Sequence, residues 1–195
     1  MDPREKDLVE RVLNGDLAAF EPLVLPYRNP LLGLAYRMTR NAEDAQEVAQ
    51  DAFLRAFKYL RNFDVERSFK NWLYQILVHS ARHFRNKRVR EEQALASGPV
   101  RETARNAPAG PERGHEQRVM RARLMNCLDV LTPREREVFL LRDIEDLNIQ
   151  ESAKVLGCSA VSVRVHLSAA RKKIRERIKA QYPDLLGATN VLPKN

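Results

Sequence analysis

Apolar residues recur at intervals of three and four along most of the chain, the spacing that places them on one face of an α-helix. Residues 8–13 follow this period and stop at Asn14-Gly15-Asp16, which predicts a first helix and its end. A second apolar run, from Ala18 to Val24, leads into prolines, so we expect a break near Pro26 to Pro30. The helical period resumes from Leu31 to Met38.

Two longer helices are expected next. Asn41 precedes Asp44 by three positions, as in a capping box, and opens a helix that runs to about Leu60. Its expected buried stripe consists of Ala45, Val48, Ala49, Ala52, Phe53, Ala56 and Phe57. After a polar loop, Ser68 caps a helix from Phe69 to about Arg90. The expected core positions of that helix are Trp72, Leu73, Ile76, Leu77 and Ala81.

The composition changes between Glu91 and Gln117. This segment contains three prolines, three glycines and no aromatic residue, and its only large aliphatic residues are Leu95 and Val100. Such a segment buries too little apolar surface to offset the entropy lost on ordering its backbone. We therefore expect a domain at 1–92, a flexible linker at 93–117, a second domain at 118–179 and a tail at 180–195.

Four shorter helices are expected in the second domain. The first runs from Val119 to Leu131, and its stripe consists of Leu124, Cys127, Leu128 and Leu131. Thr132-Pro133-Arg134-Glu135 is a capping box with proline at the first helical position, and the buried face of that helix is Val138, Phe139, Leu141 and Ile144. Asn148 and Glu151 form a second box, and the inward residues of the next helix are Ile149, Ala153 and Leu156. Gly157-Cys158-Ser159 ends it and caps the last helix, whose inner residues are Val163, Leu167, Ala170 and Ile174.

Two short capped helices joined by a glycine turn form a helix-turn-helix when the second has a basic outer face. Between Val161 and Ala180 the chain carries seven bases and one acid. A structural hairpin with a solvated charged face is the alternative, but the excess of one sign favours duplex DNA. The expected fold class is all-α, with two small helical domains joined by a flexible linker and the helix-turn-helix at the C-terminal end.

Charge and composition restrict the classes of partner and the cellular location that we expect. The 195 residues carry a net charge of +8 with a pI near 9.8, which favours a polyanionic partner, although a merely soluble basic protein would have the same charge. Residues 1–7 are charged and no apolar run approaches eighteen residues, so we expect a cytoplasmic protein without signal peptide or membrane span. Cys127 and Cys158 lack metal-site spacing and are expected to be small, reduced core residues.

Three kinds of side chain follow one another between Asn41 and Arg90. The first eleven residues carry four carboxylates and no base, which suits a basic protein surface. Eight of the thirteen aromatic residues then lie between Phe53 and Phe84, which suits unstacked nucleotides. The stretch closes on bases that suit phosphates: Arg82, Arg85, Lys87, Arg88 and Arg90. A solvated acidic face and a tryptophan packed in the core would give the same pattern.

Four motifs in this order resemble the extracytoplasmic-function group of the sigma-70 family, bacterial transcription initiation factors reduced to two domains. They are Glu47–Phe53, Arg67–Ile76, Leu131–Asp143 and Glu151–Ser159, the last followed by Val163-Arg164. The resemblance covers about residues 5–92, as sigma region 2, and 118–179, as sigma region 4. It implies a protein that binds core RNA polymerase and promoter DNA, recognises the −10 and −35 elements and promotes DNA melting, without a cofactor or metal. An anti-sigma factor is a further partner that the resemblance implies.

The resemblance also assigns site residues. Those matching the contact with core polymerase are Glu43, Asp44, Glu47, Gln50 and Asp51. Those matching the part that melts the −10 element and captures an unstacked base are Phe63, Arg67, Ser68, Trp72, Gln75, His79, Arg82, His83, Arg85, Lys87 and Arg88. Those matching the reader of the −35 major groove are Ser162, Arg164, Val165, His166, Ser168, Arg171 and Lys172. Departures from the commoner family pattern fall at His79, His83, Val165, His166, Ser168 and Ala169, so no promoter sequence is carried over.

Two other functions compete. A helix-turn-helix regulator that acts without polymerase explains residues 131–179 equally well, but it gives no reason for the acidic helix or the aromatic cluster. An enzyme is disfavoured because His79, His83, His115 and His166 never stand with a carboxylate or cysteine in ligand or triad spacing, and no glycine-rich phosphate loop occurs. Binding to core polymerase separates the sigma factor from the simple regulator.

The linker leads to a first prediction. Limited proteolysis should cut between Glu91 and Gln117 and leave two resistant fragments, because exposed polar segments are cleaved before packed helices. Mass spectrometry of the fragments locates the cuts. Early cuts between residues 41 and 90 would contradict the division into two domains.

Overall fold

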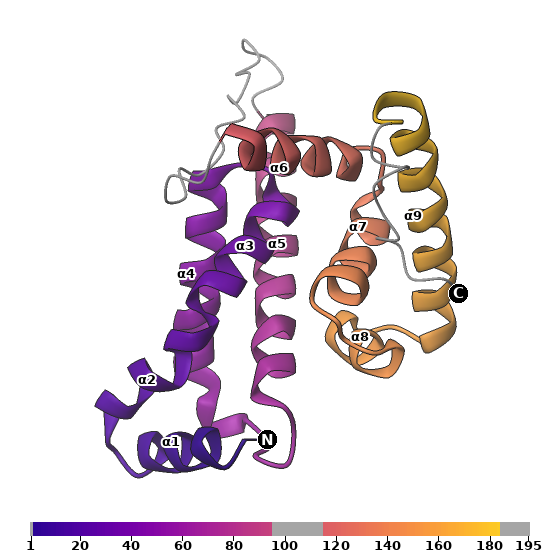
Figure 1. Cartoon of the computed structure of the whole chain (residues 1–195). Coiled ribbons are helices and arrows are strands. Elements are labelled where there is room, and N and C mark those ends of the chain that lie inside the picture. Colours follow the sequence, from indigo (N-terminus) through magenta and orange to yellow (C-terminus); the bar gives the residue numbers. More distant parts are fainter. Residues whose placement is uncertain (1, 95–114, 184–195) are drawn as a thin grey trace. The chain divides into compact units, whose positions relative to one another are not determined.

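The computed structural model describes residues 2–94 and 115–183, and the regular elements in these ranges are all helical (Figure 1). The expected all-α class is therefore confirmed. Contacts divide the chain into two compact units, one at Met1–Pro108 and Lys154–Leu156, and the other at Ala109–Ala153 and Gly157–Asn195. The central part of the expected linker, 95–114, and most of the expected tail lie outside the described residues.

The first helix, α1 (Pro3–Leu13), ends where the sequence predicts. The Asp2 carboxylate accepts a hydrogen bond from the Arg4 backbone N–H at 2.8 Å, and Pro3 occupies the first helical position. Gly15 follows the helix with φ near 100°, a backbone conformation that glycine adopts without steric strain. The chain therefore turns away from the helix at this residue.

The prolines shape the next segment. Three short turns, η1 (Leu17–Ala19), α2 (Phe20–Val24) and η2 (Leu25–Tyr27), lead into α3 (Arg28–Thr39). The expected break is thus at η2, and α3 begins two residues before Pro30. Pro30 fits there because the N–H groups of a first helical turn have no partner within the helix.

The core of the first unit is formed by α3, α4 (Ala42–Tyr59) and α5 (Phe69–Ala94), which lie side by side (Figure 1). Asn41 caps α4, because its side-chain oxygen accepts hydrogen bonds from the Glu43 and Asp44 backbones at 2.8 and 3.0 Å. The buried residues of α4 are Ala45, Val48, Ala49, Ala52 and Ala56. A short turn, η3 (Leu60–Asn62), and a loop connect α4 to α5.

Two aromatic positions on α4 differ from the expected stripe. Phe57 is 42% exposed and Phe53 is half-buried, although both were expected in the core. The small alanines take the positions against the neighbouring helices, so Phe57 is left at the edge, where its ring meets Phe20 edge to face at 5.0 Å. On α5 the half-buried Trp72 and Ile76 were likewise expected in the core, whereas Tyr74 is buried without having been predicted.

The second unit begins with α6 (His115–Leu128), which starts four residues before the expected Val119. The last three residues of the expected linker are therefore helical, since glutamate and glutamine favour a helix without contributing to an apolar stripe. Leu124 is 53% exposed and Met125 takes a buried place instead, so the expected stripe was wrong at this position. Cys127 is buried, which raises the pKa of its thiol.

The capping box that opens α7 (Pro133–Phe139) is confirmed. Thr132 Oγ1 accepts a hydrogen bond from the Glu135 backbone at 3.3 Å, and the Glu135 carboxylate accepts one from the Thr132 backbone at 2.8 Å. The helix continues as one π turn, η4 (Leu140–Ile144). A π turn holds more residues than an α turn, so Ile144 is carried away from the core and is 43% exposed, contrary to expectation.

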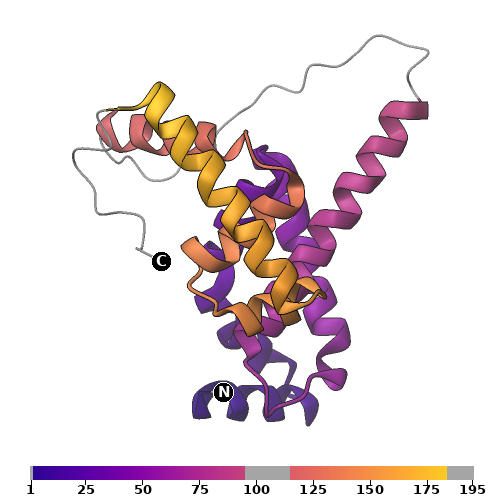
Figure 2. The ribbon, with the colours of Figure 1, turned by 90° about the vertical axis from the view of Figure 1, so that its right-hand side faces the viewer.

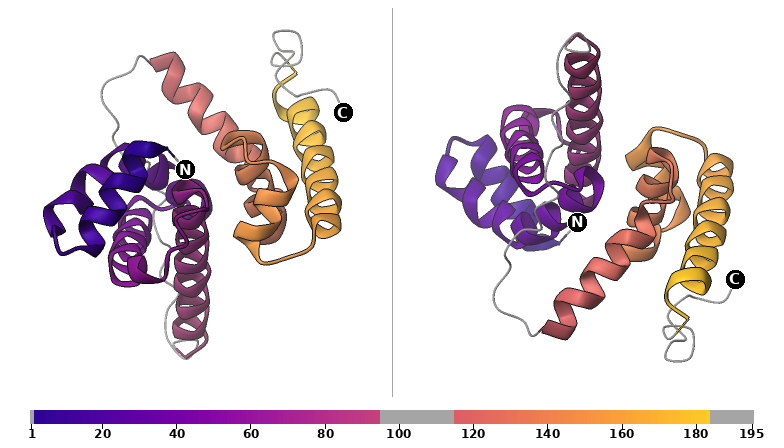
Figure 3. Two further views of the ribbon diagram at one scale, coloured as in Figure 1. Left: turned by 90° about the horizontal axis from the view of Figure 1, so that it is seen from below. Right: turned by 90° about the horizontal axis from the view of Figure 1, so that it is seen from above.

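The helix-turn-helix consists of α8 (Ile149–Leu156) and α9 (Ala160–Gln181). Gly157 links them with φ near 64°, and Ser159 Oγ accepts a hydrogen bond from the Ser162 backbone at 3.1 Å. The expected inner stripe of α9 is buried throughout, at Val163, Leu167, Ala170 and Ile174. This stripe packs α9 against α7 (Figures 1 and 3). Cys158, in the turn, is only half-buried.

Two ion pairs fasten α9 to the helices beneath it. Lys173 Nζ lies 2.8 Å from both carboxylate oxygens of Glu135, so one side chain caps α7 and holds α9. Arg171 donates two hydrogen bonds to Asp143, at 2.9 and 2.7 Å, and the Asp143 side chain is only 6% exposed. Removing Arg171 would therefore leave the enclosed Asp143 carboxylate without its counterion.

The Glu135 pair leads to a prediction about stability and pH. Burial alone would raise the pKa of Glu135, but hydrogen bonds from Lys173 and Thr132 outweigh it and hold the pKa below its ordinary 4.5. Glu135→Gln keeps a capping-box side chain and removes the charge, so it should cost about 1 kcal/mol of unfolding free energy at pH 7, a modest value because Lys173 is partly solvated.

The sign of the pH effect follows from the lowered pKa. The stabilisation by the ionised carboxylate is present above pH 4.5 and is lost as the pH falls through the folded-state pKa, so the difference between the two proteins should disappear in acid. Thermal unfolding followed by circular dichroism at several pH values measures this difference. The matched control is Glu176→Gln, an exposed position on α9. A difference that persists unchanged in acid would contradict the assignment.

Candidate polymerase and promoter interfaces

The acidic helix α4 exposes part of its expected contact set. Glu43, Glu47 and Gln50 are exposed, at positions where α4 does not pack on its neighbours. Asp44 and Asp51 are half-buried and bind within the first unit. The structure therefore separates the five polar residues into three that face solvent and two that hold other side chains.

Asp51 is engaged by its own helix. Arg55 Nε lies 2.7 Å from Asp51 Oδ2, one turn further along α4. Burial tends to raise the pKa of Asp51, but the nearby Ser80 hydroxyl and the Arg55 guanidinium outweigh it, and the pKa is lowered. The carboxylate is ionised at neutral pH, and part of its charge is already balanced.

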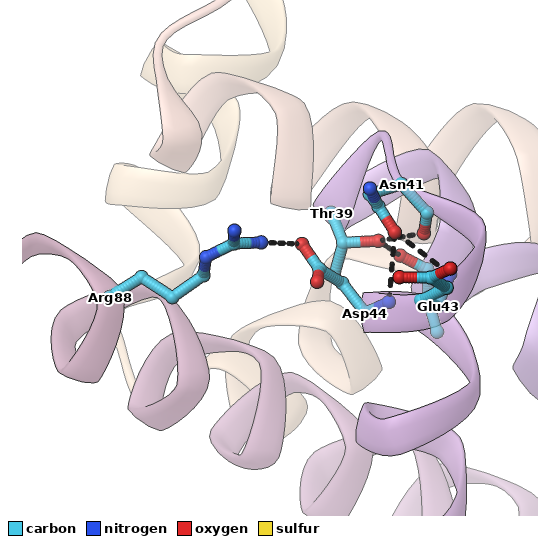
Figure 4. A network of polar contacts seen from close by, with 6 residues as sticks. Thr39, Asn41, Glu43, Asp44 and Arg88 are labelled. Atoms are coloured by element: carbon cyan, nitrogen blue, oxygen red, sulfur yellow. Dashed lines mark hydrogen bonds and ion pairs between the residues drawn. The ribbon is translucent and has the colours of Figure 1, made fainter. Parts of the chain in front are cut away.

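Asp44 pairs with a base that was expected to contact DNA. Its carboxylate accepts a hydrogen bond from Arg88 Nη1 of α5, so the pair joins the two helices (Figure 4). The Arg88 guanidinium also lies 5.8 Å from the centre of the Phe84 ring. The side chains of Asp44 and Arg88 are 16% and 33% exposed respectively, so the pair is partly enclosed. One residue from each expected surface thus contributes to the contact between α4 and α5.

The aromatic residues at the start of α5 form one cluster. The Phe63 ring lies 5.5 Å from Phe69 and 4.9 Å from Trp72, and Phe69 lies 5.7 Å from Trp72. Phe69 is fully buried and Phe63 is 6% exposed, whereas Trp72 is half-buried. Phe63, expected to contact DNA, is therefore mainly a support, and Trp72 combines a packed side with an exposed one.

The loop before α5 is ordered by Asp64. Its side chain accepts a hydrogen bond from the Glu66 backbone at 3.1 Å, and its carbonyl accepts one from the Arg67 backbone at 2.9 Å. Arg67 Nε returns to Asp64 Oδ2 at 3.0 Å while the Arg67 side chain stays 76% exposed. Ser68 Oγ accepts a hydrogen bond from the Asn71 backbone at 3.3 Å, as the predicted helix cap requires.

The remaining residues expected to contact the −10 element lie on α5, further along the helix from this loop. Those that are exposed are His79, His83, Arg85 and Lys87, and those that are half-buried are Gln75, Arg82 and Arg88. Lys87 Nζ lies 3.9 Å from a carboxylate oxygen of Glu91, a weak pair between exposed side chains. Their placement leaves a basic surface on the second half of the helix.

The residues expected on the DNA-reading face of α9 also differ in how far they are exposed. Arg164, Val165, Ser168 and Lys172 are exposed, Ser162 and His166 are half-buried, and Arg171 is bound to Asp143. Sequence reasoning selected Val165 but missed Val161, which lies one turn earlier and is 64% exposed. Its position in the first turn of a recognition helix was the available signal.

The described ranges offer neither a metal centre nor a membrane span. Among these residues no group of three or more histidine, cysteine, aspartate or glutamate side chains could hold a metal ion. None of the helices in the same ranges has the length and apolar character needed to cross a membrane.

Comparison with protein families identifies both units. The family described as Sigma-70 region 2 matches residues 23–91, and that described as Sigma-70, region 4 matches residues 118–174. The RNA polymerase sigma-H factor of Pseudomonas aeruginosa is 31% identical over 182 residues, covering 90% of this chain and 94% of that protein. The ECF RNA polymerase sigma-E factor of Haemophilus influenzae is 29% identical over 187 residues, covering 90% and 95%.

Solved structures agree with this result. CnrH, solved in complex with the cytosolic domain of CnrY, has a TM-score of 0.68 and 26% identity, and the match covers 91% of this chain and 99% of that one. The sigma factor RpoE of Bartonella quintana, solved with the anti-sigma factor NepR, has the same fold, with a TM-score of 0.69 at 22% identity over 83% and 98% of the chains. The protein therefore belongs to the extracytoplasmic-function group of the sigma-70 family.

Proposed function

We propose that the chain directs core RNA polymerase to promoters by binding core through α4, capturing the opened −10 element at the start of α5, and reading the −35 element with α9. The observation that carries the proposal is the exposed row of Glu43, Glu47 and Gln50 on α4. A regulator that binds only duplex DNA has no use for an acidic row on the unit that also carries the exposed bases of α5. We also propose that the protein acts in the cytoplasm and is not an enzyme.

The contact with core polymerase rests on the residues whose charges are available. Glu43 and Glu47 are exposed acids, and Gln50 adds an amide that can both donate and accept hydrogen bonds. Asp51 would contribute through the side of its carboxylate that Arg55 leaves open. Asp44 contributes least, because Arg88 already occupies it. A basic surface on polymerase would complement this row.

The −10 contact joins an aromatic surface to bases. The exposed part of Trp72 offers a face on which an unstacked base can stack, while Phe63 and Phe69 support the ring from behind. Arg67 and Ser68 border it on the loop side, and Gln75, His79 and Arg82 border it along α5. Further along, phosphates would lie against the exposed His83, Arg85 and Lys87, whereas Arg88 contributes less because its guanidinium is paired with Asp44.

The −35 contact uses the exposed part of α9. Arg164 can donate two hydrogen bonds to a guanine edge, and Ser168 and Lys172 lie further along the helix, toward the phosphates. Val161 and Val165 expose their methyl groups one turn apart, which suits the methyl groups of thymine. Ser162 and His166 complete this face, whereas Arg171 supports it through Asp143.

We expect the −10 contact of the first domain and the −35 contact of the second to form together only when the chain is bound to core polymerase. The linker expected between α5 and α6 is about twenty residues long, and as a flexible chain it would have an average span of about 25 Å, less than the roughly 50 Å of one and a half duplex turns that separate the two promoter elements in the family. Core polymerase would therefore hold the domains, placed at 1–92 and 118–179, at the required distance. Because the Bartonella relative was solved with an anti-sigma factor, we include such a protein among the partners.

Run-off transcription with core polymerase and a library of promoter fragments tests the function directly. We expect transcripts that start at a fixed distance from a shared pair of sequence elements and that depend on the added chain. A simple helix-turn-helix regulator would give no transcripts with core alone and would bind its site equally well without core. Band-shift titrations with and without core separate these outcomes.

Charge reversal on α4 gives a specific prediction. Glu47→Lys should lower the affinity for core polymerase about tenfold, because it places like charges at the contact, while helical content and stability stay unchanged. Fluorescence anisotropy with labelled protein measures this affinity. Glu21→Lys, an exposed acid on α2, is the matched control. If both variants bind core as the unaltered chain does, the assignment of α4 is wrong.

Substitutions of Arg164 and Arg171 on α9 should have different effects, because Arg164 is proposed to contact DNA and Arg171 stabilises the second unit. Arg164→Ala should lower the affinity of holoenzyme for a recovered promoter about tenfold and leave thermal stability unchanged. Arg171→Ala should instead destabilise the second unit by about 2–3 kcal/mol, because Asp143 is left unpaired at 6% exposure. Lys172→Ala is the control next to Arg171, and it should weaken DNA binding for all sequences and lower its salt dependence while leaving stability unchanged. Equal stability of all three variants would contradict the supporting role of Arg171.

A further inference from the structure

The N-terminal helix α1 precedes the segment that matches sigma region 2, which begins at residue 23. It lies at the end of the first unit where α4 finishes and α5 begins (Figures 1 and 2). Val9 and Val12 are buried beneath it, and the helix contacts α2 and η3. None of the polymerase and DNA contacts proposed above involves this helix of eleven residues.

Two polar links connect α1 to the proposed −10 surface. Lys6 Nζ lies 3.6 Å from Glu66 Oε1, in the loop that Asp64 orders. The Tyr27 hydroxyl donates a hydrogen bond to Glu5 Oε1. Burial and the neighbouring Glu5 carboxylate both raise the pKa of Tyr27, so its hydroxyl stays protonated and remains the donor at any physiological pH.

The Tyr27 ring extends the second link to the aromatic cluster. Its centre lies 5.7 Å from that of Phe69, which is fully buried and packs against both Phe63 and Trp72. A continuous path of contacts therefore runs from Glu5 through Tyr27 and Phe69 to Trp72. The first link of this path is a hydrogen bond to a carboxylate, which is among the stronger kinds.

We propose that α1 is a brace for promoter melting, in which Glu5, Lys6 and Tyr27 are positioning residues for the −10 surface. The inference rests on the proposed function, since it assumes that Trp72 and its loop capture an unstacked base. A base can stack on Trp72 only when the ring is suitably oriented. Contacts that hold the ring in that orientation therefore lower the entropy cost of capturing the base. None of the three residues touches the base. Their effect passes through Phe69 and the loop.

The test uses holoenzyme and a promoter recovered from the run-off library. Tyr27→Phe removes only the hydroxyl, and Tyr36→Phe removes the hydroxyl of another half-buried tyrosine in the same unit as a control. Opening is measured by permanganate reactivity of thymines in the −10 element, and core affinity and duplex binding at low temperature are measured separately. Tyr27→Phe should reduce the opened fraction about fivefold, in line with the net contribution of one hydrogen bond, with core affinity and duplex binding unchanged.

Variants of the Glu5–Tyr27 hydrogen bond and of the Lys6–Glu66 ion pair test whether these contacts act by positioning the −10 surface. Glu5→Ala should reduce opening as Tyr27→Phe does, and Glu5→Gln should restore much of it, because the amide oxygen still accepts the hydrogen bond. Lys6→Glu and Glu66→Lys should each reduce opening slightly, and the double exchange should recover it.

Three results would overturn the brace: unchanged opening in Tyr27→Phe, a loss equal to that of Tyr36→Phe, or a loss of core affinity and duplex binding as large as the loss of opening. Failure of the proposed function would be distinct, since no promoter would then be recovered with the unaltered chain.

Discussion

The close approach of α3, α4 and α5 is the constraint on which the first unit depends. Four of the five buried residues of α4 are alanines, and small side chains let helix axes come near one another. Because the inner face of α4 is so narrow, bulky Phe57 lies at the edge, and Glu43 and Glu47 stay exposed. The same packing brings Asp44 opposite Arg88 and holds the beginning of α5 against the aromatic cluster. The surface chemistry of this unit therefore follows from a buried face of α4 that contains no side chain larger than valine.

Charged side chains in this protein divide between two tasks that the sequence does not distinguish. Arg171 and Lys172 are neighbours on a basic helix, yet Arg171 is bound to Asp143 and Lys172 is exposed. Asp44 and Glu47 are separated by one turn of the acidic helix, and again one is paired and the other is exposed. In each case the paired member meets a partner at least 28 positions away along the chain. Charge patterning predicts a candidate surface, and only the packing shows which charges are available to a partner.

Local signals in the sequence were sufficient for the capped helix starts and for the buried face of α9, but not for the bounds of α6. Asn41, Thr132, Asn148 and Ser159 each cap a helix through atoms within three residues, so their roles could be predicted without knowledge of the fold. The errors at Phe57 and Leu124 have a different origin, because burial at those positions depends on which distant helix covers the stripe, and the error at Ile144 comes from the π turn, which the regular helical period does not predict. The ion pairs of Asp44 and Arg171 were missed for the same reason. The brace formed by α1 could not be predicted from the sequence either, since the positions of Glu5, Tyr27 and Phe69 follow no periodic pattern.

The π turn at Leu140–Ile144 constrains how this segment can change during evolution. A π turn accommodates an additional residue in a helix, and each residue of an α-helix advances the chain by about 100° around its axis. A residue deleted within the π turn would leave a regular helix, whereas a residue deleted within Pro133–Phe139 would rotate the residues after it by about 100° and turn Asp143 away from Arg171. This segment can therefore lose a residue more readily at the π turn than in α7. Among descendants of this chain, changes of length between Thr132 and Asn148 should fall at Leu140–Ile144.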